Sequence, residues 1–194
     1  MSQVLKKAAV GIWIVLLLPC ALLTAFGRWR LMFTIFAQAV ALVPGIIGDY
    51  ARAAYYNMTL RSCSTETRIM FGTIFAQPEA TVARNVTIGA YCVMGRARIG
   101  ERTLIASHVQ ILSGAGQHTR DAQGQLNPGN LTDVEIGPGC WIGASAVIMA
   151  NVGAGATVAA GAVVFQPVPA GATVAGNPAR MVRMASTPVS PAES

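Results

Sequence analysis

Charged residues are scarce in this chain of 194 residues: they make up 11%, whereas hydrophobic residues make up 53%. So few charges, with so many hydrophobic residues, exclude an intrinsically disordered polymer and a highly charged coiled coil. The length suits one domain with an appendage, because two independent cores would be cramped. The net charge of +6 is also unevenly spread, since residues 1–61 hold six basic residues against Asp49: Lys6, Lys7, Arg28, Arg30, Arg52 and Arg61. The rest of the chain is nearly neutral, which leaves no basic face for nucleic acid.

Cysteine patterns that hold metals or disulfides are also missing. No Cys-x-x-Cys occurs, and the four cysteines lie far apart at Cys20, Cys63, Cys92 and Cys140. This spacing argues against a disulfide framework and a zinc knuckle, and it favours a reducing compartment. We expect no metal site.

Two uncharged apolar segments dominate the first sixty residues. Residues 8–27 are about as long as a helix that crosses a bilayer, and residues 31–48 are also uncharged. Between them, Arg28-Trp29-Arg30 combines cations with an aromatic ring, as is typical of headgroup depth. Together these segments predict an α-helical hairpin that anchors the chain in a membrane.

The flanks of this hairpin predict its topology. Lys6 and Lys7 favour a cytoplasmic N-terminus, and a hairpin that either crosses twice or is re-entrant returns the chain to that side. We therefore expect residues 1–61 to hold the rest of the chain at the cytoplasmic face of a bacterial-type inner membrane. Residues 49–60 are expected to form an amphipathic helix at the interface or an ordinary surface helix. A secretory signal peptide is the alternative for the first apolar run, but it would not explain the second.

From residue 82 onward, an aliphatic residue recurs at every sixth position in four triplets: Val82, Ile88, Met94; Ile99, Ile105, Ile111; Ile136, Ile142, Ile148; Val152, Val158, Val164. The next residue is Gly or Ala in nine of these twelve hexads. A period of six fits short strands joined by tight turns and stacked as a parallel β-helix, with each aliphatic pointing inward. We predict an all-β solenoid over residues 62–183, three hexads to a coil, followed by a disordered tail over residues 184–194.

These hexads, together with residues 134–144 and 174–180, resemble those of the hexapeptide-repeat acyltransferases. The closest resemblance is to the acetyl-CoA-dependent sugar and xenobiotic O-acetyltransferases, which include maltose, galactoside, colanic-acid and chloramphenicol acetyltransferases. It covers about two thirds of the chain. The resemblance implies a left-handed parallel β-helix and a homotrimer with active sites between neighbouring prisms. Neither the handedness nor the trimer follows from the spacing alone.

The hexads break at a long segment, residues 113–133, and long excursions in compact repeats are commonly functional. Of the two histidines, His118 lies in this segment beside glycines, whereas His108 lies inside a hexad. The resemblance implies that His118 is the catalytic histidine. A neutral imidazole, with a pKa near ~6.5, suits the removal of a proton from an acceptor hydroxyl. The alternative is a histidine that only binds its own turn, which is the role we expect for His108.

Three acidic residues are candidates to orient the base: Asp121, Asp133 and Glu135. A backbone carbonyl would serve equally well.

The resemblance also implies that acetyl-CoA lies along a prism edge near the C-terminal coils. Trp141 would lie beside the pantetheine arm, with the backbones of Ala144 and Ala160 against it. Residues near the end of the solenoid would complete the cofactor site: Gln166, Asn177, Arg180 and Arg183. Many relatives have a lysine where this chain has Gln166, which puts one phosphate contact in doubt. Alternatively, the Gly-Asn-Pro sequence around Asn177 only terminates the solenoid.

These features predict a membrane-tethered O-acetyltransferase that moves an acetyl group from acetyl-CoA to a hydroxyl of a sugar, glycolipid or exopolysaccharide precursor. A lipid-linked glycan is a natural acceptor, because a tether raises the local concentration of such a substrate. The alternatives are another acyl donor, a small soluble acceptor, or a non-catalytic membrane-associated scaffold. A zinc carbonic anhydrase of this fold takes three histidines per site, and two histidines per chain are too few.

Overall fold

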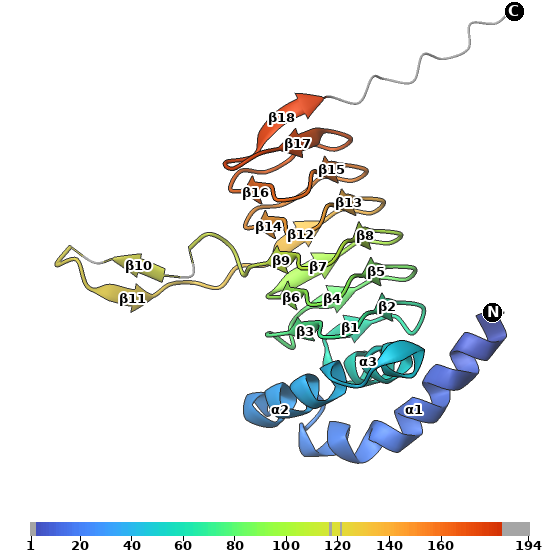
Figure 1. The fold of residues 1–194 in the computed structure, drawn as a ribbon. Coiled ribbons are helices and arrows are strands. Elements are labelled where there is room, and N and C mark those ends of the chain that lie inside the picture. The colour runs from blue at the N-terminus through green and yellow to red at the C-terminus, as the bar shows by residue number, and fades with distance from the viewer. Residues whose placement is uncertain (1–2, 117, 121, 184–194) are drawn as a thin grey trace, which may run out of the picture.

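Three α-helices precede a β-solenoid of about six coils (Figure 1). The computed structural model describes residues 3–116, 118–120 and 122–183, with the backbone alone for residues 3–7, 118–120 and 126–128. The tail that we predicted to be disordered, residues 184–194, lies outside the described residues.

Each coil passes through three sheets in turn. Sheet 1 contains β1 (Ser62–Cys63), β4 (Thr81–Val82), β7 (Ala97–Ile99) and β12 (Val134–Ile136), and it continues as single bridges through Val152 and Val168. Sheet 2 contains β2 (Arg68–Ile69), β5 (Thr87–Ile88), β8 (Leu104–Ile105), β13 (Trp141–Ile142), β15 (Thr157–Val158), β17 (Thr173–Ala175) and β18 (Arg180–Arg183). Sheet 3 contains β3 (Ile74–Phe75), β6 (Val93–Met94), β9 (Gln110–Ile111), β14 (Val147–Ile148) and β16 (Val163–Val164). Neighbouring strands are parallel, except that β18 runs antiparallel to β17.

The core of the solenoid consists of the predicted hexad residues. All twelve aliphatic residues are at most 3% exposed, and successive coils place them in register, as where Ile88 lies opposite Ile105. Removing these rows from water is the main favourable contribution to folding. The two register slips predicted at coil joins lie between β6 and β7 and after β14. The period-six prediction is therefore confirmed.

The solenoid is longer than the aliphatic triplets indicated. A further buried triplet, Cys63, Ile69 and Phe75, forms the first coil with the same spacing of six. At the other end, Val168 and Val174 continue the rows. Both ends lie within the predicted range of residues 62–183, and the first coil stands outside the aliphatic triplets because two of its three inward residues are a cysteine and a phenylalanine.

Two of the three helices close the N-terminal end of this core. Helices α1 (Gln3–Leu23), α2 (Arg30–Ala41) and α3 (Gly45–Thr59) precede the first coil. The ring of Tyr56 on α3 lies 4.8 Å from that of Phe75, and the Phe75 N–H donates a 3.2 Å hydrogen bond to the Tyr56 hydroxyl. Tyr55 donates to the carbonyl of Phe33 on α2 at 2.8 Å. The helices and the coils thus share one hydrophobic core.

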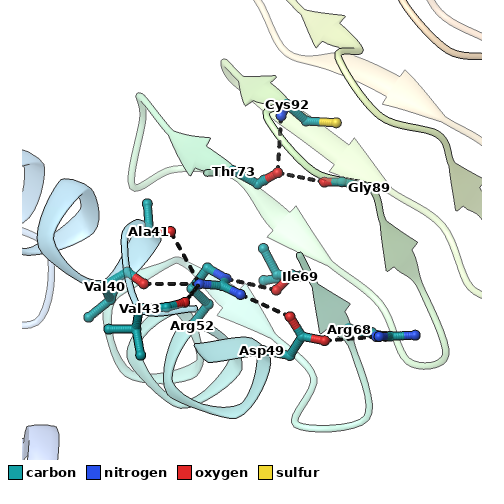
Figure 2. A network of polar contacts seen from close by, with 10 residues as sticks. All are labelled: Val40, Ala41, Val43, Asp49, Arg52, Arg68, Ile69, Thr73, Gly89 and Cys92. Carbon is teal, nitrogen blue, oxygen red and sulfur yellow. Dashed lines mark hydrogen bonds and ion pairs between the residues drawn. The ribbon is translucent and has the colours of Figure 1, made fainter. Parts of the chain in front are cut away.

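A buried arginine holds the helices to the first coil (Figure 2). Arg52 is 0% exposed and donates to the carbonyls of Val40, Ala41 and Val43, where α2 ends. It also pairs with Asp49 at 2.8 Å, and Asp49 in turn accepts from Arg68 of β2 at 2.9 Å. Burial lowers the pKa of Arg52, while its hydrogen bond to Asp49 acts in the opposite direction.

The predicted placement of residues 49–60 at a membrane interface or on an ordinary surface is therefore wrong. Arg52, Tyr55 and Tyr56 are all buried in the protein, where aromatic packing and backbone carbonyls satisfy them.

The predicted inner-membrane location is also contradicted. Within the described ranges, no helix combines the length and the apolar character needed to cross a membrane. The second apolar segment is not one helix but breaks after α2. Its buried side chains, such as Phe33 and Val40, belong to the core that α3 and the first coil share, whereas others, such as Leu42, are exposed. Helix α1 packs on α3 through Val10, and it leaves Ile12 and Val15 63% and 70% exposed. The membrane-anchoring hairpin thus has no support in this fold.

Candidate functional site

The segment that interrupts the hexads forms an arm that reaches away from the solenoid (Figure 1). We define the arm as residues 113–133. Its outer part is a two-stranded antiparallel sheet of β10 (His118–Arg120) and β11 (Leu126–Pro128). His118 begins β10, and its backbone pairs with Pro128. Its side chain lies outside what the structure describes, as does the whole of Asp121.

The two ends of the arm meet at the solenoid wall. The Thr132 N–H donates a 3.0 Å hydrogen bond to the Ser113 carbonyl. The contact is so close that a Cβ on Gly114 would lie 2.0 Å from the Thr132 hydroxyl, and Gly114 has a φ of +83°. Only glycine adopts this backbone freely and leaves room for the threonine. Beneath the arm the coils stay in register, since β12 pairs directly with β7.

Asp133, one of the acids considered for orienting the base, is committed to two arginines. Arg96 Nε donates to Asp133 Oδ1 at 2.8 Å, and Arg98 Nε donates to Oδ2 at 2.7 Å. Desolvation acts to raise the pKa of Asp133, but the hydrogen bonds from Arg98 and Arg96 outweigh it and hold that pKa below its ordinary value. Glu135 is a more distant partner, 3.8 Å from Arg98 and 60% exposed.

Arg96 and Arg98 were not among the site residues predicted from the sequence. A signal was present: an Arg-x-Arg pair in one coil faces an Asp-x-Glu pair in the next, and Arg98 lies opposite Glu135 in the register. Arg98 and Glu135 also line a pocket of about 560 Å³ on sheet 1, together with Asn151.

His108 lies on a corner of the solenoid between sheets 2 and 3. It is exposed, with a φ of +62°, and its ring stacks on Tyr91 with centroids 5.4 Å apart. Tyr91 in turn meets Phe71 edge-on. These contacts fit the structural role expected for His108.

Three of the predicted cofactor residues lie together on the same corner, nearer the C-terminus. Trp141 is 58% exposed on β13, and Ala144 follows that strand by two residues. The Gly161 N–H donates to the Ala144 carbonyl at 2.8 Å, so Ala160 lies one coil above Ala144. A Cβ on Gly143 would lie 2.4 Å from the Ala160 nitrogen, which shows how closely the two turns stack. Asn177 is exposed in the next turn of this row, where the Val163 N–H donates to the Gly176 carbonyl at 3.0 Å.

Two further predicted cofactor residues lie near each other at the last coil. Gln166 and Arg180 line a pocket of about 360 Å³, together with Phe165 and Met181. Arg183 lies at the far end of β18, opposite Thr173, and is exposed. The structure thus brings the predicted cofactor residues into a corner group and an end group.

The buried thiols are poor candidates for nucleophiles. Burial raises the pKa of Cys63 to about 12, and it also raises the pKa of Cys92 and of Cys140. A thiol reacts as its thiolate, so these groups are inert at neutral pH. In the described part of the chain, no three His, Cys, Asp or Glu side chains gather as a metal site.

Comparison with known proteins shows likeness in fold. No family model matches the sequence, and no curated protein matches it. Among solved structures, a maltose O-acetyltransferase from Clostridium difficile 630 matches with a TM-score of 0.65 at 20% identity, over 86% of this chain and 89% of that one. A hexapeptide-repeat containing acetyltransferase from Vibrio cholerae matches with a TM-score of 0.50 at 20% identity, over 84% of this chain and 92% of that one.

A third similar structure is an N-acyltransferase from Bacillus cereus in complex with dTDP and 3-hydroxybutyryl-CoA. It matches with a TM-score of 0.50 at 20% identity, over 62% of this chain and 70% of that one. The solenoid of this chain fits the left-handed β-helix of hexapeptide-repeat acyltransferases.

Proposed function

We propose that the protein is an acetyl-CoA-dependent O-acetyltransferase that acts on a hydroxyl of a sugar, glycolipid or exopolysaccharide precursor. One observation carries the proposal: an arm with His118 at the start of β10 interrupts a solenoid that exposes Trp141 on β13, the strand that leads into the turn of Ala144, and Ala160 lies one coil further on. The fold likeness to a maltose O-acetyltransferase and to another hexapeptide-repeat acetyltransferase supports this function.

In this proposal, His118 is the general base. Its neutral imidazole takes the proton of the acceptor hydroxyl as the oxygen attacks the thioester carbonyl, and the CoA thiolate leaves. Acetyl-CoA lies along the corner, with its pantetheine arm beside Trp141 and its phosphates near Arg180 and Arg183. The guanidinium group suits phosphate because its planar fork donates two parallel hydrogen bonds.

We further propose a homotrimer in which the arm of one copy completes the site of its neighbour. The direction of the arm, away from its own coils, supports this arrangement (Figure 1). Mixing His118→Ala chains with Trp141→Ala chains would then restore activity, because some mixed sites would carry both native residues. Two inactive chains that stay inactive after mixing would place each site within one copy.

The central experiment measures transfer of labelled acetyl from acetyl-CoA to maltose and to polysaccharide and glycolipid fractions of the host. The wild type is compared with His118→Ala and with the matched control His108→Ala. We expect labelling by the wild type and by the His108 variant, and a loss of about a hundredfold or more in the His118 variant. Equal labelling by all three would remove His118 as the base.

A different acyl donor is a second candidate, favoured by the 3-hydroxybutyryl-CoA in the similar Bacillus cereus structure. Competition between labelled acetyl-CoA and unlabelled 3-hydroxybutyryl-CoA distinguishes the two donors. If the longer thioester is the better substrate, acetyl transfer falls well before the two concentrations are equal.

A further inference from the structure

Arg96 contacts both ends of the arm. Its backbone N–H donates to Ser113 Oγ at 3.0 Å, at the point where the chain leaves the solenoid. Its guanidinium reaches the returning end, where it binds Asp133 Oδ1 at 2.8 Å and the Leu131 carbonyl at 3.3 Å. The Arg96 carbonyl accepts from the Val134 N–H at 2.8 Å, at the first residue of β12. Arg96, at the start of the third coil, therefore binds both the residue where the arm begins and the residues where it ends.

The hydrogen bonds between Arg96 and Asp133 and around Ser113 are strengthened by charge and by burial. The Asp133 side chain is only 17% exposed, and the second oxygen of its carboxylate is held by Arg98. Hydrogen bonds between charged groups are about twice as strong as neutral ones, and partial burial reduces their screening by salt. Ser113 is 4% exposed, and a Cβ on Gly95 would lie 2.5 Å from its hydroxyl, so the exit point is tightly packed.

The position of the outer part of the arm depends on how its two ends are held at the solenoid wall. In the outer part, backbone pairing joins β10 to β11, so we expect the two strands to rotate together. A small rotation at the solenoid wall is therefore magnified at His118. Because a displacement of about 1 Å at a reacting group can reduce a rate about a hundredfold, the base of the arm has to be fixed.

We propose that Arg96 and Asp133 are positioning residues: their ion pair clamps the arm so that His118 meets the acceptor. Asp133 then acts through the arm's geometry and not as the acid that orients the imidazole. This inference rests on the proposed function for the role of His118, but the clamp itself is a property of the arm and can be tested without activity.

The first test is amide hydrogen exchange on the full-length chain. Asp133→Asn removes the charge from the clamp, whereas Arg96→Lys keeps the charge but loses the fork that reaches both Asp133 and Leu131. The matched control is Arg84→Gln, which breaks the 3.1 Å ion pair between Arg84 and Glu101, away from the arm. We expect amides of residues 114–132 to exchange about tenfold faster in both clamp variants and at the wild-type rate in the control. Wild-type exchange in either clamp variant overturns the proposal.

The second test separates positioning from orientation of the base. On the acceptor fraction that the wild type labels, the clamp variants should lose about tenfold or more in kcat, with an unchanged KM for acetyl-CoA and an unchanged midpoint of the pH–rate profile. Were Asp133 the orienting acid, Asp133→Asn would shift that midpoint, since a nearby carboxylate raises the pKa of a histidine. Such a shift, or full activity, overturns the positioning role. If the wild type labels nothing, the proposed function fails, and the exchange experiment still decides whether the clamp exists.

Discussion

Arg52 Nε donates a 2.8 Å hydrogen bond to the carbonyl oxygen of Ile69. This bond crosses from α3 to β2, and the same guanidinium holds the end of α2 through three further carbonyls. One buried side chain therefore joins two helices to the first coil. The helical layer and the solenoid should accordingly unfold together.

Replacing Arg52 should be severely destabilising. Arg52→Ala takes a side-chain donor away from four backbone carbonyls, of which those of Val40 and Ala41 keep a backbone donor. It also removes a buried partner of Asp49, and breaking a buried pair of this kind costs about 3–5 kcal/mol. Arg68→Ala is the matched control, because Arg68 binds the same carboxylate but is 55% exposed; it should cost about 1 kcal/mol or less. Urea unfolding at one fixed protein concentration measures both changes. Similar losses in the two variants would contradict the role assigned to Arg52.

The arginine clamp on Asp133 should depend on pH only in acid. The folded-state pKa of Asp133 is lowered, so its contribution to stability is complete above the unfolded value of about 3.9 and is lost as pH falls through the folded value. The difference in unfolding free energy between the wild type and Asp133→Asn should be constant from pH 7 to about pH 5 and shrink below about pH 4. Urea titrations at pH 7, 5, 4 and 3 would show this. A difference that stays the same at pH 3 would mean that the substitution acts by another route.

Two glycines should respond in opposite ways to alanine. In Gly143→Ala, the new Cβ would meet backbone atoms of the next coil at 2.4 Å and 2.8 Å, and overpacking of this kind costs about 1–3 kcal/mol. Gly11 lies in α1 with nothing within 4 Å of such a Cβ, so Gly11→Ala should add up to about 1 kcal/mol through helix propensity. Thermal unfolding of the two variants checks both signs. Equal shifts would show that the coil spacing relaxes freely around residue 143.

The buried cysteines should resist alkylation in the folded protein. With a pKa of about 12, Cys63 is a thiolate in only about one molecule in ten thousand at pH 8. A Cys20→Ser variant retains only the three buried thiols. It should take up iodoacetamide very slowly when native and three labels in urea, as read by mass spectrometry. Rapid native labelling would show that the first coils open easily.

The solenoid was predictable because its signal is local and periodic. Within each triplet the inward residues recur at every sixth position, and all twelve are buried. The helices were misread because hydrophobicity alone does not tell whether a side chain meets lipid or protein. Tyr55 and Tyr56 belong to one hydrophobic core with the first coil of the solenoid. The residues of that coil lie beyond residue 61, so the hydrophobicity of residues 1–61 alone does not reveal this partner.

The arm shows the same limit at the candidate site. Its position and His118 are visible as a break in the hexads, but the partners of its base are not. Arg96 and Asp133 lie 37 positions apart, at opposite ends of a stretch that contains one coil and the arm. Their contact depends on the register in which β12 pairs with β7. The pairing pattern can be recognised only after the coils have been aligned.

A stack of parallel strands offers unpaired backbone groups at both ends, and such edges are templates for another chain. Here α2 and α3 cover the first coil, and β18 turns back antiparallel at the other end of sheet 2. A second molecule therefore finds no matching parallel edge at either of these places on which to continue the stack. The same elements that complete the core thus oppose end-to-end strand pairing between molecules at these two places.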